Sequence, residues 1–238
     1  MPDIEEIAAR DAYRTVAEGR VLQAAGDGIV LDRTVFYARG GGQPGDTGVI
    51  RWDGGQARVV GTVRREGSVL HVVDGDLLPE QSTVVEGEID WDRRYTLMRT
   101  HTALHALSGV IWRDFGAKVT GGNMEPGTAR MDFELEAISQ EFGRQVERVL
   151  NQELVKGYPA EIVFLAREEA LGDPDLIRTK VNLIPEWVSE IRVVDIVGLD
   201  KQADGGTHVR STLEVGEIRV VGTESKGKAN KRIRIELA

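Results

Sequence analysis

The sequence has no cysteine among its 238 residues, and this absence excludes several kinds of site. Disulfide bonds, thiolate zinc sites and a cysteine nucleophile are all impossible. No run approaches the roughly 20 apolar residues that a membrane helix needs, so we expect no membrane partner. The first residues, MPDIEEIAARD, lack the basic and apolar regions of a signal peptide. Together these absences favour a cytoplasmic protein.

Basic residues are also fewer than acidic residues. The chain has 30 Lys and Arg residues against 39 Asp and Glu residues, which gives a net charge of −9. A nonspecific nucleic-acid binder is usually basic, so the overall charge argues against that class. Two local basic segments remain, namely the stretch from Lys226 to Arg234 and the group Arg93, Arg94 and Arg99. Either segment could bind phosphates or could be ordinary solvated surface.

Two of the only four histidines, His101 and His105, lie four residues apart. Their segment predicts one helix from about Trp91 to Phe115. On a helix both imidazoles leave the same face, roughly 5–6 Å apart at Cβ. The apolar residues expected on this face are Leu97, Leu104, Ile111 and Phe115. We therefore expect the imidazoles to face the interior or a cleft rather than bulk water.

A third histidine lies in the segment from Asp204 to His208, on a Gly-Gly turn that favours no helix. An HxxxH pair by itself is more often structural than metal-binding. The second motif, with a carboxylate and an imidazole four positions apart, makes metal binding the favoured interpretation of both motifs. The fourth histidine, His71, lies in an ordinary strand pattern. The sequence thus predicts a metal site built from two distant segments.

The N-terminal third of the chain predicts β-structure. Its Val-rich, partly alternating segments lie at roughly ten-residue spacing, which suggests a small barrel or a sandwich. The expected strands are Tyr13–Ala24, Gly28–Leu31, Thr47–Trp52, Ala57–Arg64, Ser68–Val73 and Thr83–Ile89. Asp90 and Asp92 can then cap the histidine helix at its N-terminus. The change of periodicity predicts two domains, 1–89 and 90–238.

The second domain predicts an α+β arrangement, with helices segregated against a mainly antiparallel sheet. Ser139 can cap a second helix that continues to about Lys156. A helical turn from Arg167 to Leu171 should end at Gly172-Asp173-Pro174. The expected strands are Lys118–Gly121, Thr128–Leu135, Ala160–Leu165, Ile191–Ile196, Glu217–Gly222 and Ile233–Leu237.

Five glycines fall within the ten residues from Arg39 to Gly48, which we call the Gly-rich loop. Glycines permit positive φ and close backbone approach. The loop lacks the Lys-Ser/Thr ending of a phosphate-binding P-loop. What it offers to chemistry is the Gln43 side chain, which could hydrogen-bond a substrate carbonyl or hydroxyl. The alternative is a tight hairpin connection that leaves Gln43 exposed.

Taken together, these motifs resemble the editing domain of alanyl-tRNA synthetase and its free-standing relatives, the AlaX proteins. The matching segments, in chain order, are Val35–Tyr37, Gly41–Gly48, Arg99–His105, Gly205–Val209, Glu217–Ile218 and Ser225–Gly227. The N-terminal β domain with its Gly-Gly-Gln loop is similar to the medium-length AlaX class. The resemblance implies a small β-barrel-like domain followed by an α+β zinc-binding editing domain of the alanyl/threonyl-tRNA synthetase type.

The resemblance also implies an activity, the deacylation of tRNA(Ala) wrongly charged with serine and, in this class, glycine. It implies a zinc ion held by His101, His105 and His208. The fourth family position is usually Cys, and this chain has Asp204 there. A carboxylate oxygen can bind zinc at about 2.0–2.2 Å, so direct coordination remains possible. Alternatively, Asp204 stands off the metal and holds a water molecule.

By the same resemblance, two polar side chains belong to the catalytic site. Thr120 matches a family threonine whose hydroxyl lies near the substrate side chain, and Gln43 is its companion. The partner would be the acceptor end of mischarged tRNA(Ala). The residues expected to bind its phosphates are Arg93, Arg99, Lys226, Lys228, Lys231 and Arg232.

Two other functions stay open from the residues alone. The first is a catalytically inactive tRNA-binding module that zinc only stabilises. The second is a metallohydrolase of another substrate, although HxxxH lacks the glutamate of HExxH. Asp204 in place of Cys is the feature most favourable to either alternative, although the editing hydrolase remains the leading prediction. Turnover of aminoacyl esters with and without a chelator would separate all three.

Overall fold

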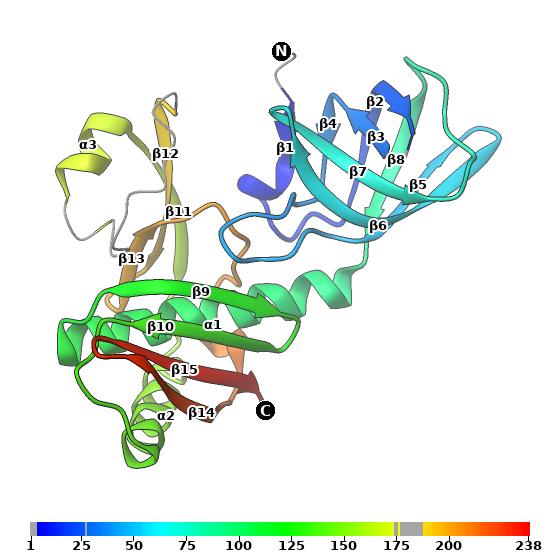
Figure 1. Cartoon of the computed structure of the whole chain (residues 1–238). Helices are drawn as coiled ribbons and strands as arrows, with labels where there is room; N and C mark the ends of the chain where they lie inside the picture. Colours follow the sequence, from blue (N-terminus) through cyan, green and yellow to red (C-terminus); the bar gives the residue numbers. More distant parts are fainter. Residues whose placement is uncertain (1–3, 27, 174–175, 177–187) are drawn as a thin grey trace. The chain divides into compact units, whose positions relative to one another are not determined.

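The computed structural model describes residues 4–26, 28–173, 176 and 188–238. The chain divides into two compact units, Met1–Thr96 and Leu97–Ala238. Helix α1 (Trp91–Phe115) contains the division, because it begins in the first unit and continues through the second (Figure 1). Among the described residues, no helix is both long enough and apolar enough to cross a membrane.

The first unit contains a closed barrel of six strands, in the order β2-β3-β7-β6-β5-β8 (Figure 1). This confirms the barrel over the sandwich. Their bounds are β2 Val16–Ala25, β3 Gly28–Leu31, β5 Gly48–Trp52, β6 Gly55–Arg65, β7 Ser68–Asp74 and β8 Val84–Ile89. The barrel core includes Val21, Ile29, Leu31, Ile50, Val59 and Val85. The short elements β1 (Glu5–Glu6), η1 (Ile7–Ala9) and β4 (Arg33–Thr34) were not predicted, because two or three residues show no periodicity.

A buried ion pair fastens the Gly-rich loop to the start of α1. The Arg94 guanidinium donates to both carboxylate oxygens of Asp46, and it also donates to Ala12 O and Val35 O at 2.8 Å each. Asp46 Oδ2 accepts a further hydrogen bond from Tyr37 N at 2.6 Å. Arg94 and Asp46 are 0% and 1% exposed. For Arg94, the alternative of ordinary solvated surface is therefore wrong.

His71 is buried inside the barrel with both ring nitrogens occupied. Nδ1 donates to Ile29 O at 2.8 Å, and Nε2 accepts from the Thr34 hydroxyl at 2.7 Å. That hydroxyl oxygen in turn accepts from Phe36 N at 3.1 Å. Burial lowers the pKa of His71 to about 4, although the Ile29 hydrogen bond acts in the opposite direction. The imidazole is therefore neutral at pH 7 and serves as a structural link between strands.

We expect His71 to make the protein sensitive to acid. Because its pKa falls from 6.5 to about 4 on folding, its contribution is complete above pH 6.5 and is lost as the pH falls toward 4. The expected loss is about 3 kcal/mol of unfolding free energy. Denaturant titrations of the wild type and His71→Leu at several pH values check this. The two curves should converge on acidification, and parallel curves would contradict the assignment.

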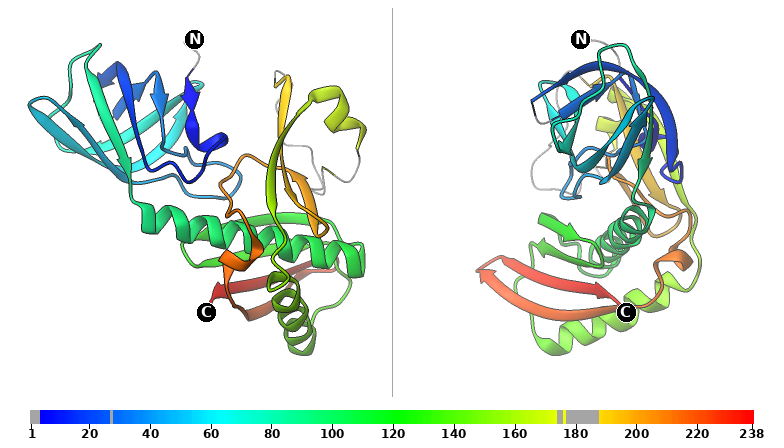
Figure 2. Two further views of the ribbon diagram at one scale, coloured as in Figure 1. Left: turned by 180° about the vertical axis from the view of Figure 1, so that it is seen from behind. Right: turned by 90° about the vertical axis from the view of Figure 1, so that its right-hand side faces the viewer.

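The second unit has a four-stranded antiparallel sheet in the order β14-β15-β10-β9. The strands are β9 Val119–Glu125, β10 Thr128–Phe133, β14 Ile218–Gly227 and β15 Asn230–Leu237. Helix α2 (Gln140–Leu154) lies along β14 (Figures 1 and 2), where Glu147 accepts from Val220 N at 2.6 Å. Ser139 caps α2 through a 3.1 Å hydrogen bond from Phe142 N, as expected.

A second, three-stranded antiparallel sheet has the order β11-β12-β13. Its strands are β11 Ala160–Ala166, β12 Glu190–Ile196 and β13 Asp200–Ala203, with α3 (Arg167–Gly172) after β11 and η3 (Thr212–Val215) after β13. Strand β13 was not predicted. The expected stop at Pro174 lies outside the described residues.

Helix α1 is more deeply buried than a single apolar face predicts. From Leu97 to Ile111, every residue except Arg99 is buried, whereas Phe115 at its end is 43% exposed. Several segments of the second unit contact its polar side chains. Thr100 accepts from Gly127 N, and Thr102 accepts from Val209 N. The helix is thus surrounded, and its histidines lie in the interior.

Candidate metal centre

Four side chains from two distant segments converge in the second unit. His101 and His105 come from successive turns of α1, and Asp204 and His208 follow β13. One ligand atom of each lies within 4.8 Å of every other. His208 Nε2 lies 3.2 Å and His101 Nε2 lies 3.7 Å from the Asp204 carboxylate. The structure therefore brings together all four residues that were predicted as metal ligands.

The backbone around Asp204 is fixed by two neighbours. Asp204 N donates to Arg192 O at 3.1 Å, and Arg192 Nη1 donates to Asp204 O at 2.8 Å. Asp204 Oδ2 accepts from Gly206 N at 2.6 Å, which closes the Gly-Gly turn. These bonds orient the carboxylate toward the histidines, with Oδ1 as the oxygen nearer His101.

Two of the histidine rings contact polar side chains through their Nδ1 atoms. His105 Nδ1 lies 3.0 Å from Asp200 Oδ2, and His208 Nδ1 lies 3.1 Å from Thr102 Oγ1. Because each contact uses Nδ1, the Nε2 atoms of His105 and His208 remain available to the centre of the cluster. The rings of His101 and His208 stack, with centroids 4.4 Å apart. Sequence analysis missed Asp200 and Thr102, and only the position of Thr102 between the two helix histidines could have drawn attention to it.

The electrostatics suit a cation. Burial lowers the pKa of His101 to about 4 and holds the pKa of His208 well below its usual range. Burial acts to raise the pKa of Asp204, but His101 and the hydrogen bond from His208 outweigh it and hold that pKa well below its usual range. His101 and His208 are therefore neutral imidazoles beside an ionised carboxylate, which are the protonation states in which these groups bind metals. Burial acts to lower the pKa of His105, but the hydrogen bond and charge of Asp200 outweigh it and raise that pKa, so a metal ion would displace a proton from this ring.

Two separations within the cluster are close to those expected around a tetrahedral ion. Bonds of about 2.1 Å to zinc place neighbouring ligand atoms about 3.4 Å apart in a tetrahedron. The separations of 3.2 Å from His208 Nε2 to Asp204 Oδ2 and 3.7 Å from His101 Nε2 to Asp204 Oδ1 lie on either side of this value, and all four ligand atoms lie within 4.8 Å of one another. Three imidazoles and one carboxylate form a donor set that zinc accepts. The residues present therefore fit a divalent metal of this type.

The two predicted catalytic side chains have different environments. Gln43 is 0% exposed, so the alternative of an exposed Gln43 is wrong. Its backbone pairs with Gly40, and a Cβ on Gly45 would lie 2.0 Å from Thr62 O, which explains a glycine at this point in the loop. Thr120 is exposed on β9 and donates to Asn230 Oδ1 at 2.8 Å.

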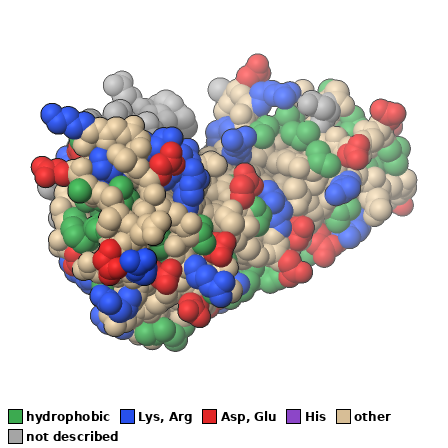
Figure 3. Space-filling view, turned by 60° about the horizontal axis from the view of Figure 1, so that its bottom comes forward, with side chains coloured by type: hydrophobic (Ala, Val, Ile, Leu, Met, Phe, Trp, Pro, Cys, Tyr) green, Lys and Arg blue, Asp and Glu red, His purple; other side chains and the backbone are tan. Residues whose placement is uncertain are grey.

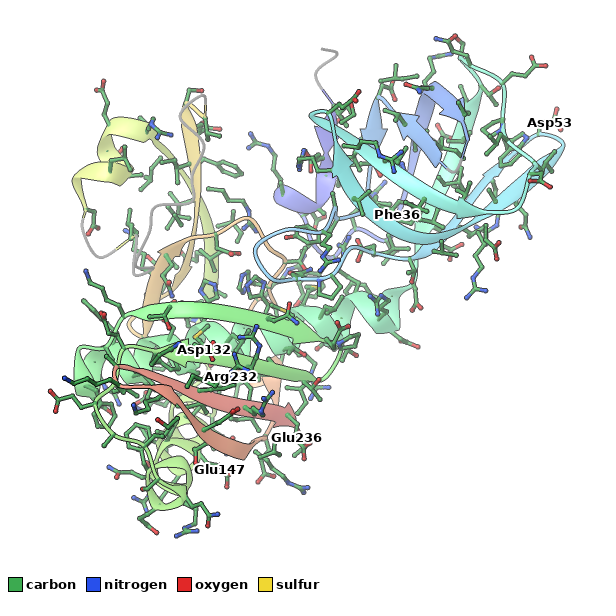
Figure 4. The ribbon with its side chains drawn as sticks, viewed as in Figure 1. Phe36, Asp53, Asp132, Glu147, Arg232 and Glu236 are labelled. Carbon is green, nitrogen blue, oxygen red and sulfur yellow. The ribbon has the colours of Figure 1, made fainter. Side chains whose placement is uncertain are left out.

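Some of the basic residues expected to bind tRNA are engaged within the protein. Arg99 donates to Val215 O at 3.0 and 2.8 Å. Lys231 is 4% exposed, and its ammonium donates to Gly227 O at 2.6 Å and Lys228 O at 3.2 Å. Arg232 forms a bidentate pair with Asp132 at 2.7 and 2.8 Å, visible in Figure 4.

The other three basic residues are more accessible or less fully bonded. Lys226 and Lys228 are exposed at the β14–β15 turn, although Lys226 lies 3.2 Å from Glu224. Arg93 Nη2 is 3.5 Å from Gly45 O, and its buried Nε has no hydrogen-bond partner within the described chain. On the face turned forward in Figure 3, basic and acidic side chains are intermixed.

Comparison with known proteins gives two family matches. Residues 7–93 match the family of class II (A) tRNA synthetases. Residues 191–234 match the second additional domain of threonyl and alanyl tRNA synthetases. The second match includes Asp204 and His208, two of the four converging side chains, and most of the β14–β15 hairpin.

Several curated relatives match over nearly the whole chain. The alanyl-tRNA editing protein AlaX-M of Saccharolobus solfataricus is 39% identical over 234 residues, which cover 96% of this chain and 97% of that protein. AlaX-M of Methanosarcina barkeri is 34% identical, with 95% and 96% covered. The alanine–tRNA ligase of Pyrobaculum calidifontis is 38% identical over 92% of this chain but only 25% of its own length.

Proposed function

Because the chain belongs to the AlaX-M family of alanyl-tRNA editing proteins, we propose that it hydrolyses the aminoacyl ester of mischarged tRNA(Ala). The proposed substrates are chiefly Ser-tRNA(Ala) and also Gly-tRNA(Ala). The convergence of His101, His105, Asp204 and His208 within 4.8 Å is the observation that most supports a hydrolytic site.

We assign the four converging side chains to zinc. When bound, zinc supplies a Lewis acid that polarises an ester carbonyl. His101, His105 and His208 would hold it through their imidazole nitrogens, and Asp204 would supply the one negative charge among the four. An ester is already activated toward water, so no protein nucleophile is needed. The role of the protein is to place the ester and a water molecule together.

Selection of serine over alanine requires a group that recognises a hydroxyl. A site that hydrogen-bonds a substrate hydroxyl rejects the analogue lacking it by about 10⁴-fold or more. We assign this role to Thr120 and Gln43, on the resemblance of their segments to the family. The exposed Thr120 hydroxyl donates to Asn230, which leaves its oxygen able to accept a second hydrogen bond.

We assign the phosphates of the acceptor end to Lys226, Lys228 and Arg93 rather than to all six basic residues. Lys231 and Arg232 direct their N–H groups to acceptors within the sheet and its turn, so they hold the hairpin in shape. Arg93 is partly exposed, and within the described residues the one hydrogen bond of its guanidinium is the long 3.5 Å contact from Nη2 to Gly45 O, so its outer nitrogens can accept a phosphate as partner.

The alternative function is a tRNA-binding module that the metal only stabilises. One observation favours it, because four protein ligands would close a tetrahedral zinc site, as in structural centres. This alternative predicts binding of tRNA(Ala) and metal-dependent folding without ester hydrolysis.

Turnover of charged tRNA separates the two functions. We expect purified protein to deacylate seryl- and glycyl-tRNA(Ala) and to spare alanyl-tRNA(Ala). A chelator should abolish the activity, and added zinc should restore it. The measurement is release of labelled amino acid, with circular dichroism to verify that the chelated protein stays folded. Bound tRNA with no release from any ester would favour the binding module.

A further inference from the structure

Behind the proposed metal ligands lies a buried carboxylate that belongs to none of the predicted sites. Asp200 begins β13 and is 3% exposed. Its Oδ2 lies 3.0 Å from Nδ1 of His105. We propose that Asp200 is the positioning residue of the metal centre, which holds His105 in the one tautomer and ring orientation that can bind the ion. This inference rests on the metal site proposed above.

The direction of the hydrogen bond follows from the acceptor. An ionised carboxylate only accepts, so His105 Nδ1 must be the protonated nitrogen. In the neutral ring, Nε2 is then unprotonated and presents its lone pair to the cluster. Without Asp200, the proton could move to Nε2 and occupy the nitrogen that the metal needs. A carboxylate paired in this way also makes its imidazole a stronger ligand.

Asp200 is itself held in place by further contacts. Gln202 Nε2 donates to the same Oδ2 at 2.8 Å and lies 3.1 Å from Ser108 Oγ on α1. Gly109, four residues after His105, allows the close approach of this segment. A Cβ there would lie 2.5 Å from Leu199 O and 3.1 Å from the Asp200 Cβ. The absence of a side chain at Gly109 therefore lets α1 and the start of β13 approach closely enough for Asp200 to contact His105.

A purely structural role for Asp200 would leave the metal unaffected. In that case its pair with His105 would only fasten β13 to α1, and its loss would weaken folding in the presence and absence of metal alike. Metal affinity and the His105 tautomer distinguish the two roles, because a structural fastening changes neither. Asp195, on neighbouring β12, offers a control carboxylate that is partly exposed and takes no part in the cluster.

The experiment compares the wild type with Asp200→Asn, Asp200→Ala and the control Asp195→Asn. Zinc affinity is measured by competition with a chromophoric chelator, using full-length protein. Loss of an outer carboxylate of this kind typically lowers metal affinity 10- to 100-fold. We expect about tenfold for Asp200→Asn, which keeps an oxygen acceptor, and nearer 100-fold for Asp200→Ala. Asp195→Asn should leave the affinity unchanged.

A second readout observes the imidazole directly. Long-range ¹H–¹⁵N spectra of the zinc-loaded wild type should show a protonated Nδ1 of His105 whose proton is protected from solvent exchange. That protection should disappear in Asp200→Ala. Zinc affinity equal to wild type in both Asp200 variants would overturn the role of Asp200 while leaving the metal centre intact. A wild type that binds no zinc would overturn the proposed centre and this role together.

Discussion

Replacing Asp204 with alanine is expected to cost the proposed centre two to three orders of magnitude in zinc affinity. Structural zinc sites with four ligands bind with about 10–16 kcal/mol. An equal share for each ligand is about 3 kcal/mol, and each 1.4 kcal/mol is a factor of ten. Asp204 also provides the carboxylate that lies 3.2 Å from His208 and 3.7 Å from His101. Its removal leaves three neutral imidazoles around a divalent ion.

Deacylation of seryl-tRNA(Ala) should fall with zinc occupancy in this variant. Assayed at limiting zinc it should be nearly inactive, and excess zinc should restore part of the rate. Zinc content by mass spectrometry of the native protein and the rate of amino-acid release are the two measurements. Unchanged zinc affinity would place Asp204 outside the coordination sphere.

Asp204→Cys is the matched variant for this position. It keeps a single negative charge when the metal is bound, and it introduces the softer ligand that the family usually has at this position. We expect it to retain zinc and to bind harder ions such as Mn²⁺ less well, because thiolate favours zinc over hard cations. A Cys variant as impaired as the alanine variant would show that the hydrogen bond from Gly206 N to Asp204 matters more than coordination.

The second large effect is expected at Arg94. Breaking a buried ion pair by removing one partner typically costs about 3–5 kcal/mol, because the remaining charge stays buried and uncompensated. Arg94→Met leaves Asp46 in that situation and also leaves Ala12 O and Val35 O without their donor. We therefore expect a loss of this size in the unfolding free energy of the first unit, measured by denaturant titration.

The destabilisation caused by Arg94→Met should be greatest in the Gly-rich loop. Asp46 accepts from Tyr37 N, and Asp46 N donates to Tyr37 O at 3.0 Å, so the pair closes the loop that contains Gln43. Amide hydrogen exchange of Tyr37 and Asp46 should become faster in the variant. The control is Arg51→Met, which removes an exposed pair with Glu88 and should cost less than about 1 kcal/mol. Equal effects from the two substitutions would contradict the structural role of Arg94.

The local features of the chain could be determined from the sequence because they depend on near neighbours. Helix α1 has the predicted bounds, since Asp90 caps it with a 3.1 Å hydrogen bond from Arg93 N and its periodicity is helical. The pairing of His101 with His105 follows from helical geometry alone. The second pair, Asp204 and His208, was identified from its four-residue spacing and from the resemblance of its segment to the family.

Other features depend on which distant segments meet, and only the tertiary structure decided them. Nothing near Asp200 in the chain marks it as the partner of His105, which lies 95 residues away. Arg94 and Lys231 look like surface charges, yet both side chains are buried and acceptors within the protein take up their N–H groups. The physical reason is that a charged side chain has no periodic signature of burial. Its role is set by the acceptor that folding brings to it.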